Sequence, residues 1–105
     1  MIATRKKGAT YERYVAHRLA EVWPRAARGC QFRGDERPDV TGTPFHVEAK
    51  HRRTVSIQAA MRQAITDSSG PPPVVVSRDN HGDDLVTMRL DDWLALAART
   101  KAGTP

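Results

Sequence analysis

Apolar residues recur at helical spacing near the start of the chain and predict a first helix over about residues 9–25. Its apolar stripe comprises Tyr11, Tyr14, Val15, Leu19, Val22 and Trp23. These positions lie three or four residues apart, as one face of a helix requires. Thr10 is a suitable N-cap, and Pro24 predicts the end, because the residue before a proline avoids helical backbone angles. The basic residues 1–7 are expected to form a flexible arm.

Two further helices follow from the same kind of pattern. The first is expected over about residues 56–67, and its buried stripe comprises Ile57, Ala60, Met61, Ala64 and Ile65. The second is expected to begin at Asp91 and to end near residue 98. It carries Trp93, Leu94 and Leu96. Trp93 and Trp23 are expected to be core residues, and an exposed apolar patch on this last helix is the alternative, which would suit a dimer surface.

Shorter patterns predict the strands. Strands are expected at residues 30–33, 39–41, 44–50, 74–76 and 85–90. Those at 39–41 and 44–50 should form a hairpin about Gly42 and Thr43, and the apolar run of three valines at 74–76 is typical of a central strand covered on both faces. The order helix, strand, hairpin, helix, strand, strand, helix indicates an α/β fold with a mixed central sheet flanked by helices.

The 105-residue chain is long enough for one domain, expected at residues 8–99 with a flexible tail at 100–105. No stretch has the length of a membrane span, and the first residues lack the apolar run of a secretory signal. Cys30 is the only cysteine, so no internal disulfide can form. A reducing, cytoplasmic setting and no membrane partner are therefore expected.

Positive charge is concentrated in the first part of the chain. Residues 1–62 hold 13 Lys or Arg and 6 Asp or Glu, whereas residues 63–105 hold 4 and 6. A polyanion is the natural partner of such a surface, and a nucleic acid is the commonest one. A surface that merely keeps the protein in solution would explain the charge equally well.

Two carboxylates and one lysine lie within this basic part, in the predicted hairpin. On a strand, Glu48 and Lys50 project from one face with His46, and the opposite face carries Phe45, Val47 and Ala49. Asp39 lies on the other arm of the hairpin, so that its carboxylate and that of Glu48 can share a Mg²⁺ or Mn²⁺ ion, with the Ala49 carbonyl as a third oxygen. An ordinary surface ion pair would give the same alternation.

Three short motifs carry a resemblance to a known family. The segment from Lys7 to Arg13 reads KGATYER, Pro38–Val40 reads PDV, and Val47–Lys50 reads VEAK. In this order and spacing they resemble the PD-(D/E)xK nuclease superfamily, and they are most similar to archaeal-type and phage Holliday-junction resolvases. The resemblance covers about residues 6–66. It implies a restriction-endonuclease-like αβββαβ core and a divalent-metal-dependent endodeoxyribonuclease of phage type, which cuts branched DNA as a homodimer without a small-molecule cofactor.

The resemblance also implies roles for individual residues. The catalytic residues would be Glu12, Asp39, Glu48, Lys50 and Gln63. Among them, Asp39 and Glu48 would bind the metal together with the Ala49 carbonyl, and Glu12 would reach it through water. A solvent-facing acid favoured by the helix dipole is the alternative for Glu12, and Gln58 is the alternative to Gln63.

DNA contacts are expected from basic residues around the hairpin and the N-terminal arm. These are Arg5, Lys6, Lys7, Arg33, Arg37, His51, Arg52 and Arg53. Two alternative functions stay open on the sequence alone. The first is another nuclease of the same superfamily, of repair or restriction type, and the second is a non-catalytic nucleic-acid-binding module that keeps the fold.

Overall fold

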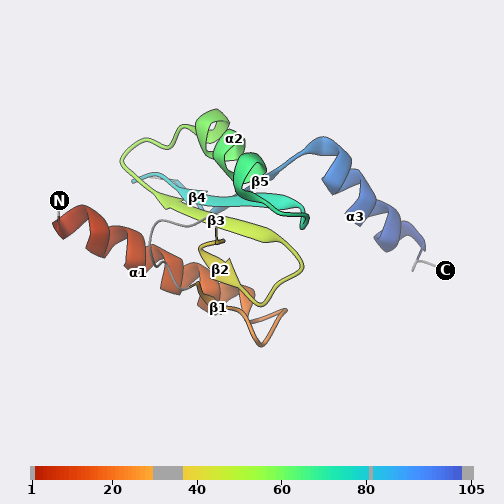
Figure 1. Cartoon of the computed structure of the whole chain (residues 1–105), viewed down its shortest axis with the longest axis horizontal. Coiled ribbons are helices and arrows are strands. Elements are labelled where there is room, and N and C mark those ends of the chain that lie inside the picture. The colour runs from red at the N-terminus through yellow and green to blue at the C-terminus, as the bar shows by residue number, and fades with distance from the viewer. Residues whose placement is uncertain (1, 30–36, 81, 103–105) are drawn as a thin grey trace.

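The computed structural model describes residues 2–29, 37–80 and 82–102, with the side chains of residues 2–7 and 102 excepted (Figure 1). The elements in this part of the chain are α1 (Ile2–Leu19), β1 (Ala27–Arg28), β2 (Val40–Thr41), β3 (His46–His51), α2 (Ile57–Asp67), β4 (Pro73–Arg78), β5 (Leu85–Met88) and α3 (Leu90–Ala102). The strand predicted at 30–33 lies outside the described residues. The other predicted elements are present, with shifted ends.

The limits of α1 differ most from the prediction. The helix begins at Ile2, because no proline precedes Thr10 and Gly8 lies within the helix without ending it. It ends at Leu19 rather than near Arg25. There the backbone N–H groups of both Val22 and Trp23 donate to the Leu19 carbonyl, which closes the last turn well before Pro24.

The C-terminal elements also differ from their predicted limits. Strand β5 ends at Met88, and α3 begins at Leu90 and continues to Ala102, so that the helix includes part of the predicted tail. The Trp93 N–H donates to the Arg89 carbonyl as the first intrahelical bond. None of the helices in the described part of the chain has the length and apolar composition that a bilayer crossing requires.

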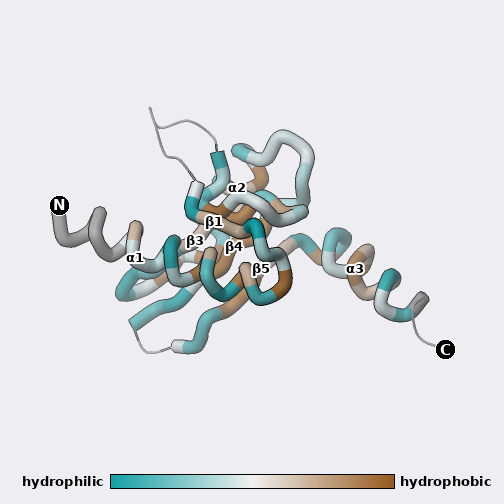
Figure 2. The backbone as a smooth tube through the Cα atoms, turned by 90° about the horizontal axis from the view of Figure 1, so that it is seen from below, coloured by the Kyte–Doolittle hydropathy of each residue, from teal (hydrophilic) through white to brown (hydrophobic). Residues whose placement is uncertain are grey.

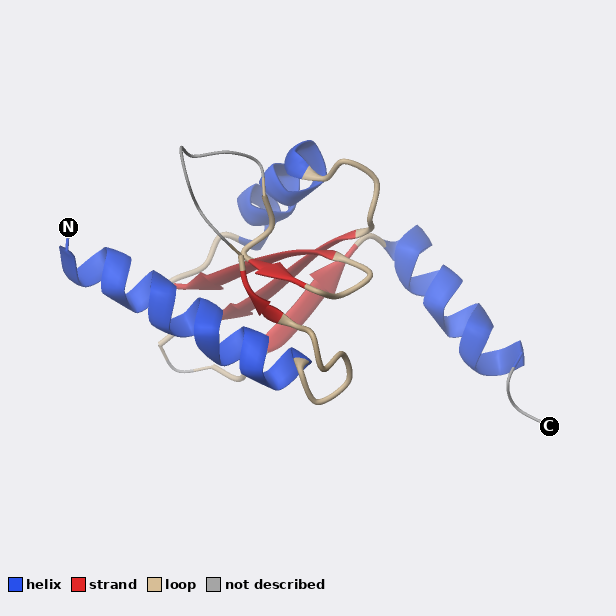
Figure 3. Ribbon diagram, turned by 60° about the horizontal axis from the view of Figure 1, so that its bottom comes forward, coloured by secondary structure: helices blue, strands red, loops and turns tan. Residues whose placement is uncertain are grey.

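The five strands form one mixed sheet in the order β1-β2-β3-β4-β5. Strands β3 and β4 are parallel, with α2 as the crossover between them, and every other neighbouring pair is antiparallel. Helix α1 covers β1, β2 and β3 on one face, and α2 covers β3 and β4 on the other (Figures 1 and 3). The expected α/β fold with a mixed central sheet is confirmed at this level.

The alternation of side chains along the central strand divides the core into two clusters. In β4, Val74 and Val76 pack toward α1, whereas Val75 is fully buried against Ala60, Met61 and Ala64 of α2. The α1 cluster comprises Tyr11, Val15, Ala16, Val40, Val47, Ala49, Val74 and Val76. The prediction of a central strand buried on both faces is therefore confirmed.

Several residues predicted for the core lie elsewhere. Ile65 is 40% exposed, since α2 packs through Ala60, Met61 and Ala64. Trp23 is half-buried, with its ring edge-on to Phe45 at 5.6 Å between centroids. Trp93 and Leu94 of α3 are exposed, because α3 extends from the end of the sheet instead of lying on it (Figure 3).

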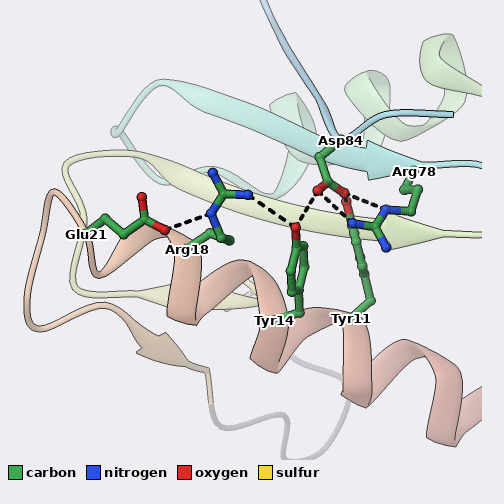
Figure 4. Close-up of polar contacts among 6 residues, drawn as sticks. All are labelled: Tyr11, Tyr14, Arg18, Glu21, Arg78 and Asp84. Carbon is green, nitrogen blue, oxygen red and sulfur yellow. Dashed lines mark hydrogen bonds and ion pairs between the residues drawn. The ribbon is translucent and has the colours of Figure 1, made fainter.

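A polar cluster fastens α1 to the β4–β5 end of the sheet (Figure 4). The carboxylate of Asp84 accepts hydrogen bonds from the hydroxyls of Tyr11 and Tyr14, at 2.9 and 2.6 Å. It also accepts two bonds of 2.8 Å from the Arg78 guanidinium. Because Tyr11 and Tyr14 lie on the same face as the neighbouring Val15, this cluster fixes the rotation of α1 against the sheet.

We expect Asp84→Asn to lower the free energy of unfolding by about 2 kcal/mol at pH 7, since hydrogen bonds to a charged group are lost. The hydrogen bonds from Arg78 hold the pKa of Asp84 down at about 2, below its ordinary value of 3.8. Its stabilisation is therefore complete above pH 3.8 and is lost as the pH falls through 2. Urea unfolding at pH 7 and at pH 2 measures the difference in stability between Asp84→Asn and the wild type. The exposed Asp83→Asn is the control. Equal stability of the two variants at pH 7 would contradict it.

Candidate active site

A polar cleft of about 250 Å³ opens where α1, β3 and α2 approach one another. Its lining comprises Gly8, Glu12, Arg37, Asp39, Glu48, Ala49, Lys50, His51, Arg52, Gln63 and Asp67. Four of these side chains are carboxylates and three are Lys or Arg. The cleft therefore gathers residues of the hairpin with two residues of the first helix and two of the second, although they are far apart in the sequence.

Strand β3 supplies the centre of the cleft through its alternation. Glu48 and Lys50 line the cleft, while Val47 and Ala49 belong to the α1 core cluster, as the period-two pattern predicts, and Ala49 also borders the cleft. Glu48 is only 5% exposed. Its Oε2 lies 3.0 Å from Nε2 of the equally buried His46. His46 projects from the same face of β3 and hydrogen-bonds the Glu48 carboxyl group, which fixes its position.

Asp39 is fixed at the edge of the same strand. Its backbone N–H donates to the Val47 carbonyl, and its Oδ2 accepts from the Ala49 N–H at 2.9 Å. The pairing of β2 with β3 is registered only at Val40 and Val47, so the Asp39 carboxylate takes the place of a backbone carbonyl as acceptor for the Ala49 N–H. The N–H and C=O of one strand residue point to the same side. The Ala49 carbonyl is therefore directed toward Asp39 as well.

The burial of Glu48 changes its protonation. The pKa of Glu48 is raised to about 8, first by burial and then by the negative charge of Asp39, while the positive charge of Lys50 acts in the opposite direction. Burial also lowers the pKa of His46. Both pKa shifts favour a neutral hydrogen-bonded pair of Glu48 and His46 over an ion pair.

Glu12 reaches the cleft from α1 but has a partner that the sequence did not suggest. Its Oε1 accepts a 2.8 Å hydrogen bond from Nε of Arg28 on β1, and its side chain is 14% exposed. Burial raises the pKa of Glu12, while the bond from Arg28 and the charge of Lys50 lower it. The structure thus places Glu12 beside Asp39 and Lys50, as an ion-paired rather than a solvent-facing acid.

Helix α2 contributes one predicted residue and one that was missed. Gln63 lines the cleft, whereas its alternative Gln58 is exposed and is not part of the lining. Asp67 lies one turn after Gln63 and also lines the cleft. The spacing of four residues along the helix was a usable signal, because it puts both side chains on one face.

The predicted DNA-contacting residues divide into three groups. Arg37, His51 and Arg52 line the cleft, and the His51 ring also packs on Tyr11 at 5.1 Å between centroids. Arg53 is exposed next to the cleft without lining it. The remaining residues cannot be placed, because Arg33 and the side chains of Arg5, Lys6 and Lys7 lie outside the described part of the chain.

A second cavity of about 270 Å³ adjoins the cleft. The two share Lys50, Arg52 and Gln63, and the second is completed by the turn into α2, with Thr54, Val55 and Ser56. No acidic residue lines it. Together they form a continuous depression whose carboxylates are concentrated at one end and whose other end carries only basic and neutral side chains.

Within the residues that the structure describes, no group of three or more His, Cys, Asp or Glu side chains is arranged to hold a metal ion. Neither a family model, a curated protein nor a solved structure matches the chain. The chemistry of the cleft must therefore be inferred from its own geometry and charge.

Proposed function

We propose that this protein is a Mg²⁺- or Mn²⁺-dependent endodeoxyribonuclease of the PD-(D/E)xK type, with branched DNA as its substrate. One observation carries the proposal. Asp39, Glu48 and Lys50 meet in a single cleft, where they are joined by Glu12 and Gln63 from the two helices. Glu12, Asp39 and the pair Glu48 and Lys50 come from three separate motifs of the sequence, and chance matches would have no reason to converge in space.

The order of elements supports the same proposal. From α1 to β4 the chain runs helix, three strands, helix, strand, which is the αβββαβ order expected of a restriction-endonuclease-like core. The parallel pair β3–β4 and its crossover α2 hold Glu48, Lys50 and Gln63 on one side of the sheet. Fold alone does not specify an activity, so the argument rests on the cleft residues.

The donor atoms of the cleft fit a hard divalent cation. Carboxylate oxygens of Asp39 and Glu48, together with the Ala49 carbonyl, are the ligands that Mg²⁺ prefers, and Mg²⁺ needs only one or two carboxylates because it keeps several waters. The cleft lining contains no cysteine, so a structural zinc site is not suggested. A cation would also offset the cost of burying Glu48 beside Asp39, which is visible in the raised pKa of Glu48.

A divalent cation bound there would activate a water molecule and neutralise charge that develops on the phosphate. Lys50 lies next to the two carboxylates, and its ammonium group would donate to the attacking water or to a phosphate oxygen and stabilise the transition state as a fixed positive charge. Gln63 would orient the water by hydrogen bonding. Arg37 and Arg52, at the margins of the cleft, would hold the flanking phosphates.

A nicking assay on four-way junction, flap and linear DNA tests the proposal. The wild-type protein should cut junction DNA with Mg²⁺ or Mn²⁺ and not with EDTA, and Asp39→Asn should reduce cutting by at least about 10³-fold. Asparagine keeps an oxygen that accepts from the Ala49 N–H, so that the fold is preserved. Asp83→Asn removes the same charge from an exposed loop and should cut normally.

The alternatives give different results in the same assay. Salt-sensitive DNA binding without metal-dependent cutting would leave a non-catalytic binding module. Cutting that depends on Asp39 but does not prefer branched DNA would indicate a repair or restriction type of nuclease. Equal cutting by Asp39→Asn and the wild type would refute the proposed site.

A further inference from the structure

Helix α2 lies along strand β3 but runs in the opposite direction (Figure 1). The parallel register of β3 and β4 begins with His46 opposite Pro73, so the two strands start at the same end of the sheet. Because α2 leads from the end of β3 back to the start of β4, its last residue, Asp67, lies toward the start of β3. Its N-cap, Ser56, lies toward the end of β3. The cleft and the adjoining cavity, which together we call the groove, extend between these two ends.

Charge changes sign along the groove. Glu48 and Asp67 line it toward the start of β3. Lys50 and Arg52 lie toward the end of β3 and also line the adjoining cavity, whose described lining contains no acid. Arg37 precedes β2, which is antiparallel to β3, and therefore lies toward the same end as Lys50. One end of the groove is therefore acidic and the other is basic.

The dipole of α2 reinforces this difference. A helix carries partial positive charge at its N-terminus and partial negative charge at its C-terminus. In α2 the N-terminus lies at the basic end of the groove and the C-terminus lies at the acidic end. The basic end therefore attracts phosphate groups, and the acidic end repels them.

Asp67 brings negative charge to the acidic end without a visible role in folding. It is half-buried, and none of the ion pairs in the described part of the chain involves it. It occupies the last position of α2, where a negative charge is unfavourable beside the helix dipole and where the helix has no basic residue. The packing of α2 on β4 relies on hydrophobic segments instead (Figure 2). Asp67 therefore contributes to the groove at a cost to the helix.

The charge of Asp67 acts on the centre of the cleft. Burial is the main cause of the raised pKa of Glu48 and of the lowered pKa of His46, and the negative charge of Asp67 acts on both groups in the direction that raises each pKa. The carboxylates of Asp67 and Glu48 therefore face the same space. A divalent cation held by Asp39 and Glu48 would balance the charges of those two carboxylates and would leave Asp67 uncompensated.

We propose that Asp67 is a specificity-determining residue, which keeps phosphates out of the acidic end so that a DNA strand occupies the groove on only one side of the scissile phosphate. This inference rests on the proposed nuclease function. Beyond the scissile phosphate the strand must leave the groove at an angle. A strand changes direction in this way at a branch point. A straight duplex instead carries phosphates at about 3.4 Å per step along each strand, and these would continue into the acidic end.

Binding to a four-way junction and to a linear duplex of the same sequence tests the inference, with Ca²⁺ present to prevent cutting. Asp67→Asn removes the charge and keeps the size of the side chain. It should bind the duplex at least about tenfold more tightly than the wild type, because a repulsion between like charges is removed, and it should bind the junction within about twofold. Asp67→Glu retains the charge and should keep the wild-type preference. The exposed Asp83→Asn removes a charge outside the groove and should keep it as well.

Two further measurements exclude other roles of Asp67. Calorimetry should show that Asp67→Asn binds Mn²⁺ as the wild type does, because Asp67 is not a ligand of the proposed cation. Thermal unfolding should show that the variant is at least as stable as the wild type, since an unfavourable charge at the C-terminus of α2 is gone. In the nicking assay, the ratio of junction cutting to duplex cutting should fall at least about tenfold in Asp67→Asn.

The outcomes distinguish this inference from the nuclease proposal. Tighter duplex binding by Asp67→Asn, in a protein that cuts neither DNA, would support the role of Asp67 and contradict the nuclease activity. Cutting that depends on Asp39, with an unchanged DNA preference in Asp67→Asn, would overturn the inference alone. It would also be overturned by a wild-type protein that binds both DNAs equally, or by loss of Mn²⁺ binding in Asp67→Asn.

Discussion

Glu48→Gln is expected to abolish cleavage and at the same time to stabilise the folded protein at alkaline pH. The variant should cut junction DNA at least about 10³-fold more slowly than the wild type, because the proposed cation site would lose one of its two carboxylate ligands. Glutamine nearly matches glutamate in shape and can still hydrogen-bond His46. The buried face of β3 should therefore remain intact.

The effect on stability follows from the direction of the pKa shift. The pKa of Glu48 is about 8 in the folded protein, above its ordinary value of 4.5, so the folded state binds the proton more tightly than the unfolded state. The wild-type protein should consequently lose stability as the pH rises from 4.5 to 8, by an amount on the order of 3 kcal/mol. Glutamine cannot ionise, and this loss should be absent from the variant.

Urea unfolding at pH 6 and pH 9 measures the effect. The stability difference between Glu48→Gln and the wild type should grow with pH, and Mg²⁺ should narrow it by stabilising only the wild type. Glu21→Gln makes the same replacement in an exposed pair with Arg18 and should show neither change. Unaltered cleavage by Glu48→Gln, or a wild-type stability that does not fall toward pH 9, would contradict the interpretation of the cleft.

Local patterns predicted the parts of the site that depend on strand and helix periodicity. The alternation along β3 correctly separated Glu48 and Lys50 from Val47 and Ala49, because a strand has a fixed period of two. Likewise, the helical pattern alone placed Gln63 on the second helix, although it did not show which way that helix faces. Such patterns specify which residues share one face of a strand or helix. The cleft is lined by one face each of β3, α1 and α2.

Contacts between distant segments left no comparable signal. The ion pair between Arg28 and Glu12 joins β1 to α1, and the bonds from Tyr11 and Tyr14 to Asp84 span most of the chain. The last helix was expected to place Trp93 in the core, with an exposed apolar patch as the alternative, for a related reason. Its periodicity indicates a helix with one apolar face, but it does not specify whether that face packs on the protein's own sheet or on something else.

Lys50→Met should slow cleavage by about 10²- to 10³-fold, the size of effect that follows the loss of one fixed charge at a transition state. Binding of the divalent cation should be retained, because Asp39 and Glu48 are unchanged. Methionine keeps the apolar stem of the side chain, so the packing of β3 is preserved. Single-turnover cleavage measures the rate, and calorimetry with Mn²⁺ and catalytically inert Ca²⁺ measures cation binding.

The pH profile provides a second and independent readout. The charge of Lys50 lowers the pKa values of both Glu48 and Glu12, so its removal should shift the onset of residual cleavage to higher pH. Arg52→Met removes a nearby charge that makes no described bond to Glu48 or Glu12. It should weaken DNA binding and reduce the salt dependence of that binding. The pH at which cleavage begins should stay the same. Lys50→Met could instead leave the pH onset in place and only weaken DNA binding, as expected for Arg52→Met. Lys50 would then bind DNA without taking part in the chemical step. A lysine that acts on the reacting phosphate must also influence the carboxylates beside it.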